Sequence, residues 1–256
     1  MTNYGDDAMR YLLSITLAIF SHANVQSMEL LPKGECAAPE AFHDYRHCNF
    51  NGRDLTGVDL QGSHLQGVNF QNTKLLDCKL TGANLTGSDF KWAILVGCEA
   101  DTADFSDADL FHANFDETSL NGANFHKAYM FGASVNEAKA DSANFAHANL
   151  KDISMEESQL TNCHFDQAFM MRAVLIGSNL AGSSLRQVTL TGAALEQANF
   201  SGADLSGSLL NGTTLTDTSF RGAKLSGTRF VNSRLQAVDF TDAEDIPADL
   251  PPDTGG

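Results

Sequence analysis

Every fifth residue from Phe50 to Phe240 is apolar, and the register does not slip over these 39 positions. Leu occupies 21 of them and Phe occupies 12, while the six others are Ala100, Met130, Val135, Ala140, Met155 and Met170. A period of five matches neither the 3.6-residue turn of an α-helix nor the two-residue repeat of a strand. Self-similarity at a fixed period over this length indicates a repeat protein whose units stack on one another.

The residue two places before each apolar position is nearly always small. Typical units are Ala-Asn-Leu-Thr-Gly (83–87) and Ala-Asp-Leu-Ser-Gly (203–207). This small–polar–large–x–x unit closely resembles the pentapeptide-repeat family, over about three quarters of the chain. The resemblance implies an all-β fold, a right-handed quadrilateral β-helix (solenoid) of about ten coils, with four pentapeptides per coil and short N- and C-terminal caps. We expect the large and small residues to point into the shaft and the other three positions to face solvent.

Glycine is concentrated at one position of the repeat. Of the 21 glycines, 17 lie two places after an apolar position. A type II turn at each corner would put its third residue there, with a positive φ that Gly adopts without strain. Between Thr102 and Arg172, however, only Gly122 and Gly132 occupy this position. The middle of the rod is therefore predicted to use other turn types.

The ends of the chain differ from the repeats. Arg10 precedes an apolar run at 11–20 and a polar stretch, which is typical of a secretory signal. Residues 1–27 are therefore predicted to be a signal peptide or, alternatively, an N-terminal cap segment. The run is too short for a membrane span, and no transmembrane span is predicted. The predicted divisions continue with an N-terminal cap at 28–45, the β-helix at 46–240 and an acidic, Pro-containing tail at 241–256. A signal peptide predicts an exported (periplasmic, lumenal or secreted) protein; without one, the protein would be cytoplasmic.

The cysteines fall into two groups. Cys36 and Cys48 flank the first coil and could form a disulfide in an oxidising compartment. Cys78 and Cys98 are 20 residues apart, so they stack in adjacent coils at the inward small position. We expect these two to remain packed thiols, and Cys163 to be a core residue.

Charge and motifs narrow the class of function. A formal net charge of −16 argues against direct nucleic acid binding, but permits a basic protein partner or imitation of nucleic acid. We find no Gly-rich phosphate loop, nucleophile elbow or CxxC motif, so we expect no enzyme activity and no cofactor. Lys127 lies in the column of Asp107 and His147, which favours solvated surface histidines over a metal site. The other histidines predicted for that face are His64, His126 and His164.

Residues that repeat every 20 positions should form columns along the rod. Most outward positions are polar, but one face carries five exposed apolar side chains: Phe111, Phe131, Tyr129, Phe169 and Met171. The adjacent face carries two columns of acids: Glu117, Glu137 and Glu157 in one, and Asp116 and Glu156 in the other. We predict one binding surface, in which the aromatic residues supply affinity and the acids steer a basic partner. The same surface could form a homodimer.

The sequence therefore predicts a non-enzymatic scaffold that binds a protein partner, or itself, through this aromatic and acidic belt. The family resemblance implies an alternative, a DNA mimic that binds type II topoisomerase (gyrase) and protects it from quinolones. The acidity and the rod shape favour that alternative. Export, the unbroken repeat register and the Pro-containing tail argue against it.

Overall fold

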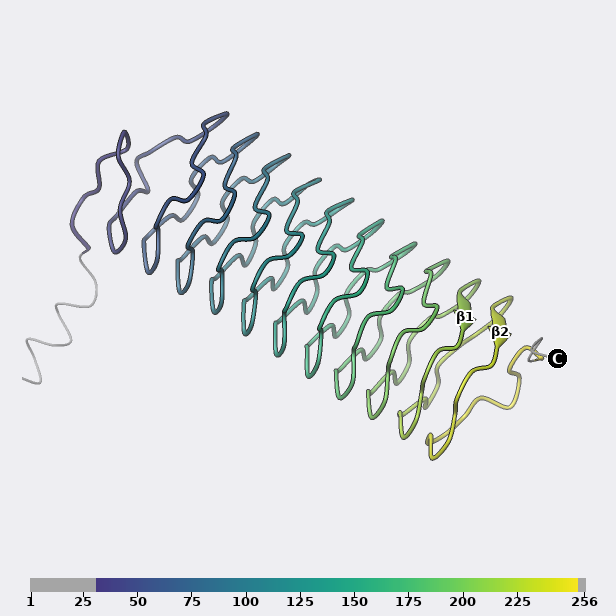
Figure 1. Cartoon of the computed structure of the whole chain (residues 1–256). Helices are drawn as coiled ribbons and strands as arrows, with labels where there is room; N and C mark the ends of the chain where they lie inside the picture. Colours follow the sequence, from purple (N-terminus) through teal and green to yellow (C-terminus); the bar gives the residue numbers. More distant parts are fainter. Residues whose placement is uncertain (1–30, 253–256) are drawn as a thin grey trace, which may run out of the picture.

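The repeat winds into a rod of stacked rungs (Figure 1), which a computed structural model describes for residues 31–252. Parallel β-bridges join residues 20 apart, beginning Asp44↔His64, Asn49↔Asn69, Asp54↔Lys74, Asp59↔Lys79. Because a bridge recurs every five residues and the chain returns after 20, each rung has four sides of one pentapeptide each. The predicted repeat solenoid is confirmed. The signal or cap segment predicted at 1–27 lies outside the described residues.

Regular strands are short because turns interrupt every side. The two strands of the described chain, β1 (Thr214–Thr216) and β2 (Arg234–Gln236), are three residues long and pair in parallel with Leu215 opposite Leu235. On most other sides a single residue forms the bridge between two turns. No helix within residues 31–252 has the length and apolar character needed to cross a membrane.

The apolar positions fill the shaft as predicted. From Phe50 to Leu235, each residue at a multiple of five is at most 6% exposed, and Phe240 is partly buried against the same core. Stacking places identical residues one rung apart, so rings such as Phe125 and Phe145 lie parallel with centroids 4.9 Å apart. The core is therefore continuous along the rod, and burial of its apolar surface provides the main driving force for folding.

Most buried hydroxyl groups in the small position form hydrogen bonds with the preceding rung. The Oγ of Ser158 donates to the carbonyl O of Val135 at 2.7 Å and accepts from the N–H of Ala138 at 3.2 Å. It thus bridges the two ends of the turn one rung earlier. Ser183 does the same between Leu160 and Cys163. Buried polar groups need such partners, so Ser can replace Ala in the shaft.

The backbone conformation at the corners of the rungs differs from one prediction. All 39 residues at the third turn position, from Gly52 to Asp242, have φ between +52° and +73°, although 22 of them are not Gly. The middle of the rod therefore keeps the same corner geometry, and the expectation of other turn types there is wrong. The reason is non-local, because the N–H of each such residue from Gly52 to Gly222 bonds to the next rung. Glu117 N donates to Asn136 O at 2.9 Å, much as Gly52 N donates to Gln71 O at 2.8 Å.

The cysteines correct another prediction. Cys78 and Cys98 form a disulfide between stacked rungs, with Cα atoms 4.5 Å apart, so the expectation of packed thiols is wrong for this pair. Cys36 and Cys48 also form a disulfide, with Cα atoms 5.6 Å apart. Cys163 is a buried free thiol, and burial raises its pKa to about 12.

Both ends of the rod are covered by returning chain. At the N-terminal end, Lys33 bridges to Asp44, which also bridges to His64. At the C-terminal end the last bridge is Lys224↔Glu244, after which the tail turns back and Leu250 packs against the core. Chain outside the repeats thus contacts the end rungs of the rod.

Candidate protein-binding surface

Three of the five predicted aromatic and Met residues lie in mutual contact on the outside of the rod. The Phe111 and Phe131 rings stack one rung apart, with centroids 5.6 Å apart and an interplanar angle of 14°. Tyr129 lies nearly parallel to both, with its centroid 6.2 Å from that of Phe111 and 6.4 Å from that of Phe131. The column arrangement that the period implies therefore does bring these rings together.

Two further rings extend this group by one rung, and sequence reasoning missed them. Trp92 is 53% exposed and stacks on the imidazole of His112, with centroids 4.4 Å apart and an interplanar angle of 4°. Both rings also meet Phe111 edge-on. We call the five residues the ring cluster: Trp92, Phe111, His112, Tyr129 and Phe131. Trp92 and His112 occupy the corner position, where Gly is the most frequent residue, and the single Trp of the chain at that position was the signal that could have revealed them.

The remaining two predicted residues lie farther along the rod. Phe169 is 38% exposed and bridges to Asn149, which in turn bridges to Tyr129, so one rung separates the two aromatic residues. Met171 is half-buried, and its carbonyl accepts the Asp152 N–H. Asn149 and Lys151 therefore separate both from the ring cluster.

Charged side chains border the ring cluster. The Lys151 ammonium lies over the Phe131 ring, 5.3 Å from its centroid, as in a cation–π contact. On the opposite side, Lys91 bonds Asp109 at 2.7 Å and Asp89 at 3.0 Å. Burial raises the pKa of Asp89, but hydrogen bonds from Gln71 and Lys91 outweigh burial and hold the pKa below its usual value. The cluster thus has a polar rim, a common feature of interfaces.

The acidic column of Glu117, Glu137 and Glu157 is exposed on three successive rungs. All three residues are third-turn residues, with φ of 60°, 56° and 54°. The Glu157 carboxylate lies over Gly177 of the next rung, where a Cβ would come 2.6 Å from its Oε1. Three like charges at equivalent corners make a line of negative potential along the rod.

Asp116 and Glu156 have mainly local roles. Asp116 Oδ1 accepts from Ser134 Oγ at 2.5 Å and from Asn136 N at 2.9 Å. Asn136 in turn accepts from Ser154 Oγ and Glu156 N at 2.7 and 2.8 Å. This column is half-buried and links successive rungs, so its side chains are less accessible to a partner than those of the acidic column.

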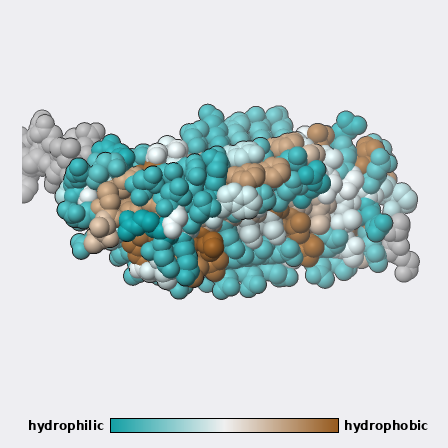
Figure 2. Space-filling model, turned by 90° about the horizontal axis from the view of Figure 1, so that it is seen from above, coloured by the Kyte–Doolittle hydropathy of each residue, from teal (hydrophilic) through white to brown (hydrophobic). Residues whose placement is uncertain are grey.

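The ring cluster and the acidic column form two stripes along neighbouring faces. Between them runs a row whose bridges join Ile94, Asn114, Ser134, Ser154 and Val174 in order. Within residues 31–252, no described ring contact, ion pair or hydrogen bond joins a ring-cluster side chain to the acidic column. A partner large enough to cover both would span one side of the rod. Figure 2, which shows one side of the molecule, has hydrophobic patches separated by a mainly hydrophilic surface.

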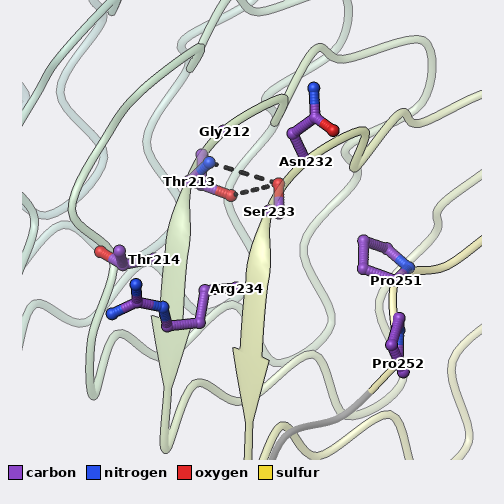
Figure 3. Close-up of a pocket in the computed structure, with 8 residues that line it drawn as sticks. All are labelled: Gly212, Thr213, Thr214, Asn232, Ser233, Arg234, Pro251 and Pro252. Carbon is purple, nitrogen blue, oxygen red and sulfur yellow. Dashed lines mark hydrogen bonds between the residues drawn. The ribbon is translucent and has the colours of Figure 1, made fainter.

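Two other features of the described chain, a pair of histidines and a pocket, are weaker candidates for a functional site. The His126 and His147 rings meet edge-on with centroids 5.2 Å apart. A pocket of about 440 Å³ lies where the tail meets the last rungs (Figure 3). Its wall includes a hydrogen bond from Thr213 N to Ser233 Oγ, and Arg234 is its single charged lining residue. This lining lacks an acid–base pair that could support catalysis.

Comparison with known proteins agrees with the rung geometry. The family model described as pentapeptide repeats (8 copies) matches residues 46–82, 141–177, 153–192, 170–207 and 203–242, and the model of the pentapeptide repeat region matches 68–145. No curated protein sequence matches the chain significantly.

Several solved structures are similar. HetL, a pentapeptide repeat protein involved in heterocyst differentiation regulation from the cyanobacterium Nostoc sp. strain PCC 7120, is 25% identical (TM-score 0.36, covering 78% of this chain and 86% of HetL). QnrB1, a plasmid-mediated fluoroquinolone resistance protein, is 20% identical (TM-score 0.40, 70% and 91% covered). A protein from the Arabidopsis thaliana thylakoid lumen, AT2G44920, is 27% identical (TM-score 0.20, 55% and 70% covered). On the strength of the family models and the 20-residue rungs, the chain belongs to the pentapeptide-repeat family.

Proposed function

We propose that the protein is a non-enzymatic scaffold that binds a protein partner, or a second copy of itself, through the ring cluster. The observation that carries this proposal is that outward-facing rings contact one another over three rungs on a rod whose other outward positions are mostly polar. Trp92 is 53% exposed and Tyr129 is 39% exposed, while Phe111, His112 and Phe131 are half-buried. Isolated exposed apolar residues are common on any protein, but a contiguous group of aromatic residues favours a contact site.

The geometry suits binding without rearrangement. Each ring stands on a rung that is hydrogen-bonded to the rungs before and after it, so the cluster exists before a partner arrives. Rigid aromatic residues lose little conformational entropy on binding, and aromatic residues often dominate binding energy. The acidic column, one row away, would attract a basic partner and raise the rate of encounter rather than the final affinity.

The test is the double substitution Phe111→Ser with Phe131→Ser. Neither ring enters the shaft, so circular dichroism should be unchanged. Light scattering should show half the mass if the wild type is a dimer. If the wild type is not a dimer, cross-linking in the native host should recover the partner with the wild type but not with the variant. Val231→Ser is the matched control, since Val231 is 39% exposed on a distant rung. Unchanged mass together with unchanged partner recovery would reject this surface.

The acidic column has its own test. Changing Glu117, Glu137 and Glu157 together to Gln should slow association several-fold at low salt, with little change at high salt. Fluorescence of Trp92, the single Trp of the chain, would report binding directly because its ring lies in the cluster. If the association rates of the wild type and the variant depended equally on salt concentration, the acidic column would have no role in steering the partner.

DNA mimicry is the alternative, and the net charge of −16 is the feature that favours it. DNA mimicry predicts that the protein binds a type II topoisomerase. This binding should depend on the acidic residues and should be unchanged by the double Ser substitution. Export also remains a prediction. Sequencing the N-terminus of protein purified from its source tests it, and cleavage near Ser27 would exclude a cytoplasmic topoisomerase as partner.

A further inference from the structure

The N-terminal end of the rod holds a sulfur and nitrogen cluster that is separate from the candidate binding surface. The segment around Lys33 pairs with the one around Asp44, with Gly34 N bonded to Asp44 O at 3.0 Å and Asp44 N to Pro32 O at 2.8 Å. The Cys36–Cys48 disulfide joins the same two segments. We call this arrangement the clasp.

His47 points its Nε2 at both sulfur atoms of the clasp. The distance from Nε2 is 3.5 Å to Cys36 Sγ and 3.6 Å to Cys48 Sγ. Within residues 31–252, these three side chains make the one group of three or more His, Cys, Asp or Glu side chains whose potential ligand atoms all lie within 4.8 Å of one another. The convergence needs a chemical explanation, because a disulfide alone does not require an imidazole.

The backbone of the clasp is held independently of the disulfide. Cys48 N bonds to Tyr45 O at 2.8 Å in a turn, and Ala38 N bonds to Glu35 O at 3.1 Å in another turn around Cys36. The Arg53 guanidinium donates to the carbonyl O of Cys36. Reduction would therefore free two thiols while these contacts keep them beside His47.

We propose that the reduced clasp is a Zn²⁺ site with Cys36, Cys48 and His47 as ligands. Reduction by a dithiol or phosphine adds two electrons and two protons and breaks the S–S bond. Zn²⁺ then displaces both thiol protons and accepts the imidazole nitrogen. Two thiolates and one imidazole form a ligand set that zinc prefers, with a fourth position open to water. His47 also lines a hollow of about 390 Å³ together with Leu31, Lys33, Asp44 and Arg46, so its ring is reached from solvent.

The other sulfur atoms are poor competitors. Cys163 is fully buried, and burial raises the pKa of its thiol, which disfavours the thiolate that a metal needs. Cys78 and Cys98 are at most 1% exposed inside the shaft. The clasp is thus the site that solvent and metal reach first. Zinc would cross-link the same two segments as the disulfide, so the rod end stays closed in either an oxidising or a reducing compartment.

The test uses the full chain, reduced and purified without oxygen, and titrated with Co²⁺ as a spectroscopic substitute for Zn²⁺. We expect a sulfur-to-cobalt charge-transfer band at one equivalent, which added Zn²⁺ abolishes. The pair Cys36→Ser with Cys48→Ser should lose the band while circular dichroism shows the rod intact. His47→Ala should bind Co²⁺ at least about tenfold more weakly.

His43→Ala is the matched control, since the His43 Nδ1 lies 2.7 Å from the Ala41 carbonyl O rather than at the sulfurs. It should bind Co²⁺ like the wild type. Absence of a charge-transfer band in the reduced wild type, or a band that persists in the double Ser variant, overturns the proposal. Equal affinity of the His47→Ala and His43→Ala variants removes His47 from the site and overturns the assignment as well.

Discussion

The middle rungs and the C-terminal rungs of the rod have the same backbone path. They differ in the residues that fill the core and in the residues at the corners. Inside, all six apolar positions that are neither Leu nor Phe lie between Ala100 and Met170, whereas every such position from Leu175 to Phe240 is Leu or Phe. At the corners, residues 102–172 hold Gly only at 122 and 132, whereas most corners in residues 177–227 are Gly. The corner φ values are nevertheless the same in both regions.

This difference shows at which corners the residues adopt a backbone conformation that is energetically unfavourable for them. A left-handed conformation costs an L-residue about 1–2 kcal/mol relative to its preferred one, and Asn and Asp tolerate it better than most. The middle rungs place Thr102, His112 and Glu137 in that conformation. Each such corner carries a side chain where Gly would leave the surface bare. The acidic column and His112 stand on these corners, and Trp92 stands on the non-Gly corner one rung before His112. This is the pattern expected if the exposed side chains are selected for contact.

The largest expected effect tests the shaft that both regions share. Leu150→Asp and Leu205→Asp each bury an unpaired charge at a fully buried position, so each should cost more than about 4 kcal/mol and abolish cooperative unfolding. Circular dichroism melting checks this. The neighbouring outward substitution Asn149→Asp keeps the acceptor for Lys151 N and should melt like the wild type. If one Asp variant folds normally, the two regions do not share the same core.

Substitutions at Gly and non-Gly corners should change stability by intermediate amounts and with opposite signs. An added Cβ at Gly202 meets no atom within 4 Å, so Gly202→Ala tests backbone strain alone and should destabilise by about 1 kcal/mol. Thr102→Gly should instead stabilise by up to about 1 kcal/mol, because it relieves a β-branched residue at φ 57°. Urea midpoints at an unchanged slope provide the measurement. Shifts of the same sign would show that strain does not distinguish the regions.

The smallest expected effect concerns charge. Glu137 has Glu117 and Glu157 at equivalent corners of the adjacent rungs, so Glu137→Gln should stabilise by a few tenths of a kcal/mol at low salt. In about 1 M salt the gain should vanish, because the screening length falls to about 3 Å. Asp217 has Gln197 and Ala237 at the equivalent corners, and Asp217→Asn should change stability little at either salt concentration. A gain that persists at high salt would point to strain rather than repulsion.

Much of the candidate surface could be predicted from the five-residue period together with the four-sided coil that the family resemblance implies. Phe111 and Phe131 were assigned to one column because they are 20 residues apart, and their rings do stack. Trp92 and His112 were missed because their direction depends on corner geometry, for which the local sequence was misleading. Phe169 and Met171 lie two rungs further along the same columns, as expected, with Asn149 and Lys151 between them and the other rings.

By itself, the sequence determined the five-residue register and the buried positions, which follow from local periodicity because one face of each unit must be buried. The four-sided rung, and with it the columns on the surface, was implied by the resemblance to the pentapeptide-repeat family. The tertiary structure alone decided the left-handed corners at non-Gly residues, the Cys78–Cys98 bond and the stacking of Trp92 on His112. Each of these depends on a neighbouring rung 20 residues away, whose hydrogen bonds hold the backbone in a conformation that local preference would not select.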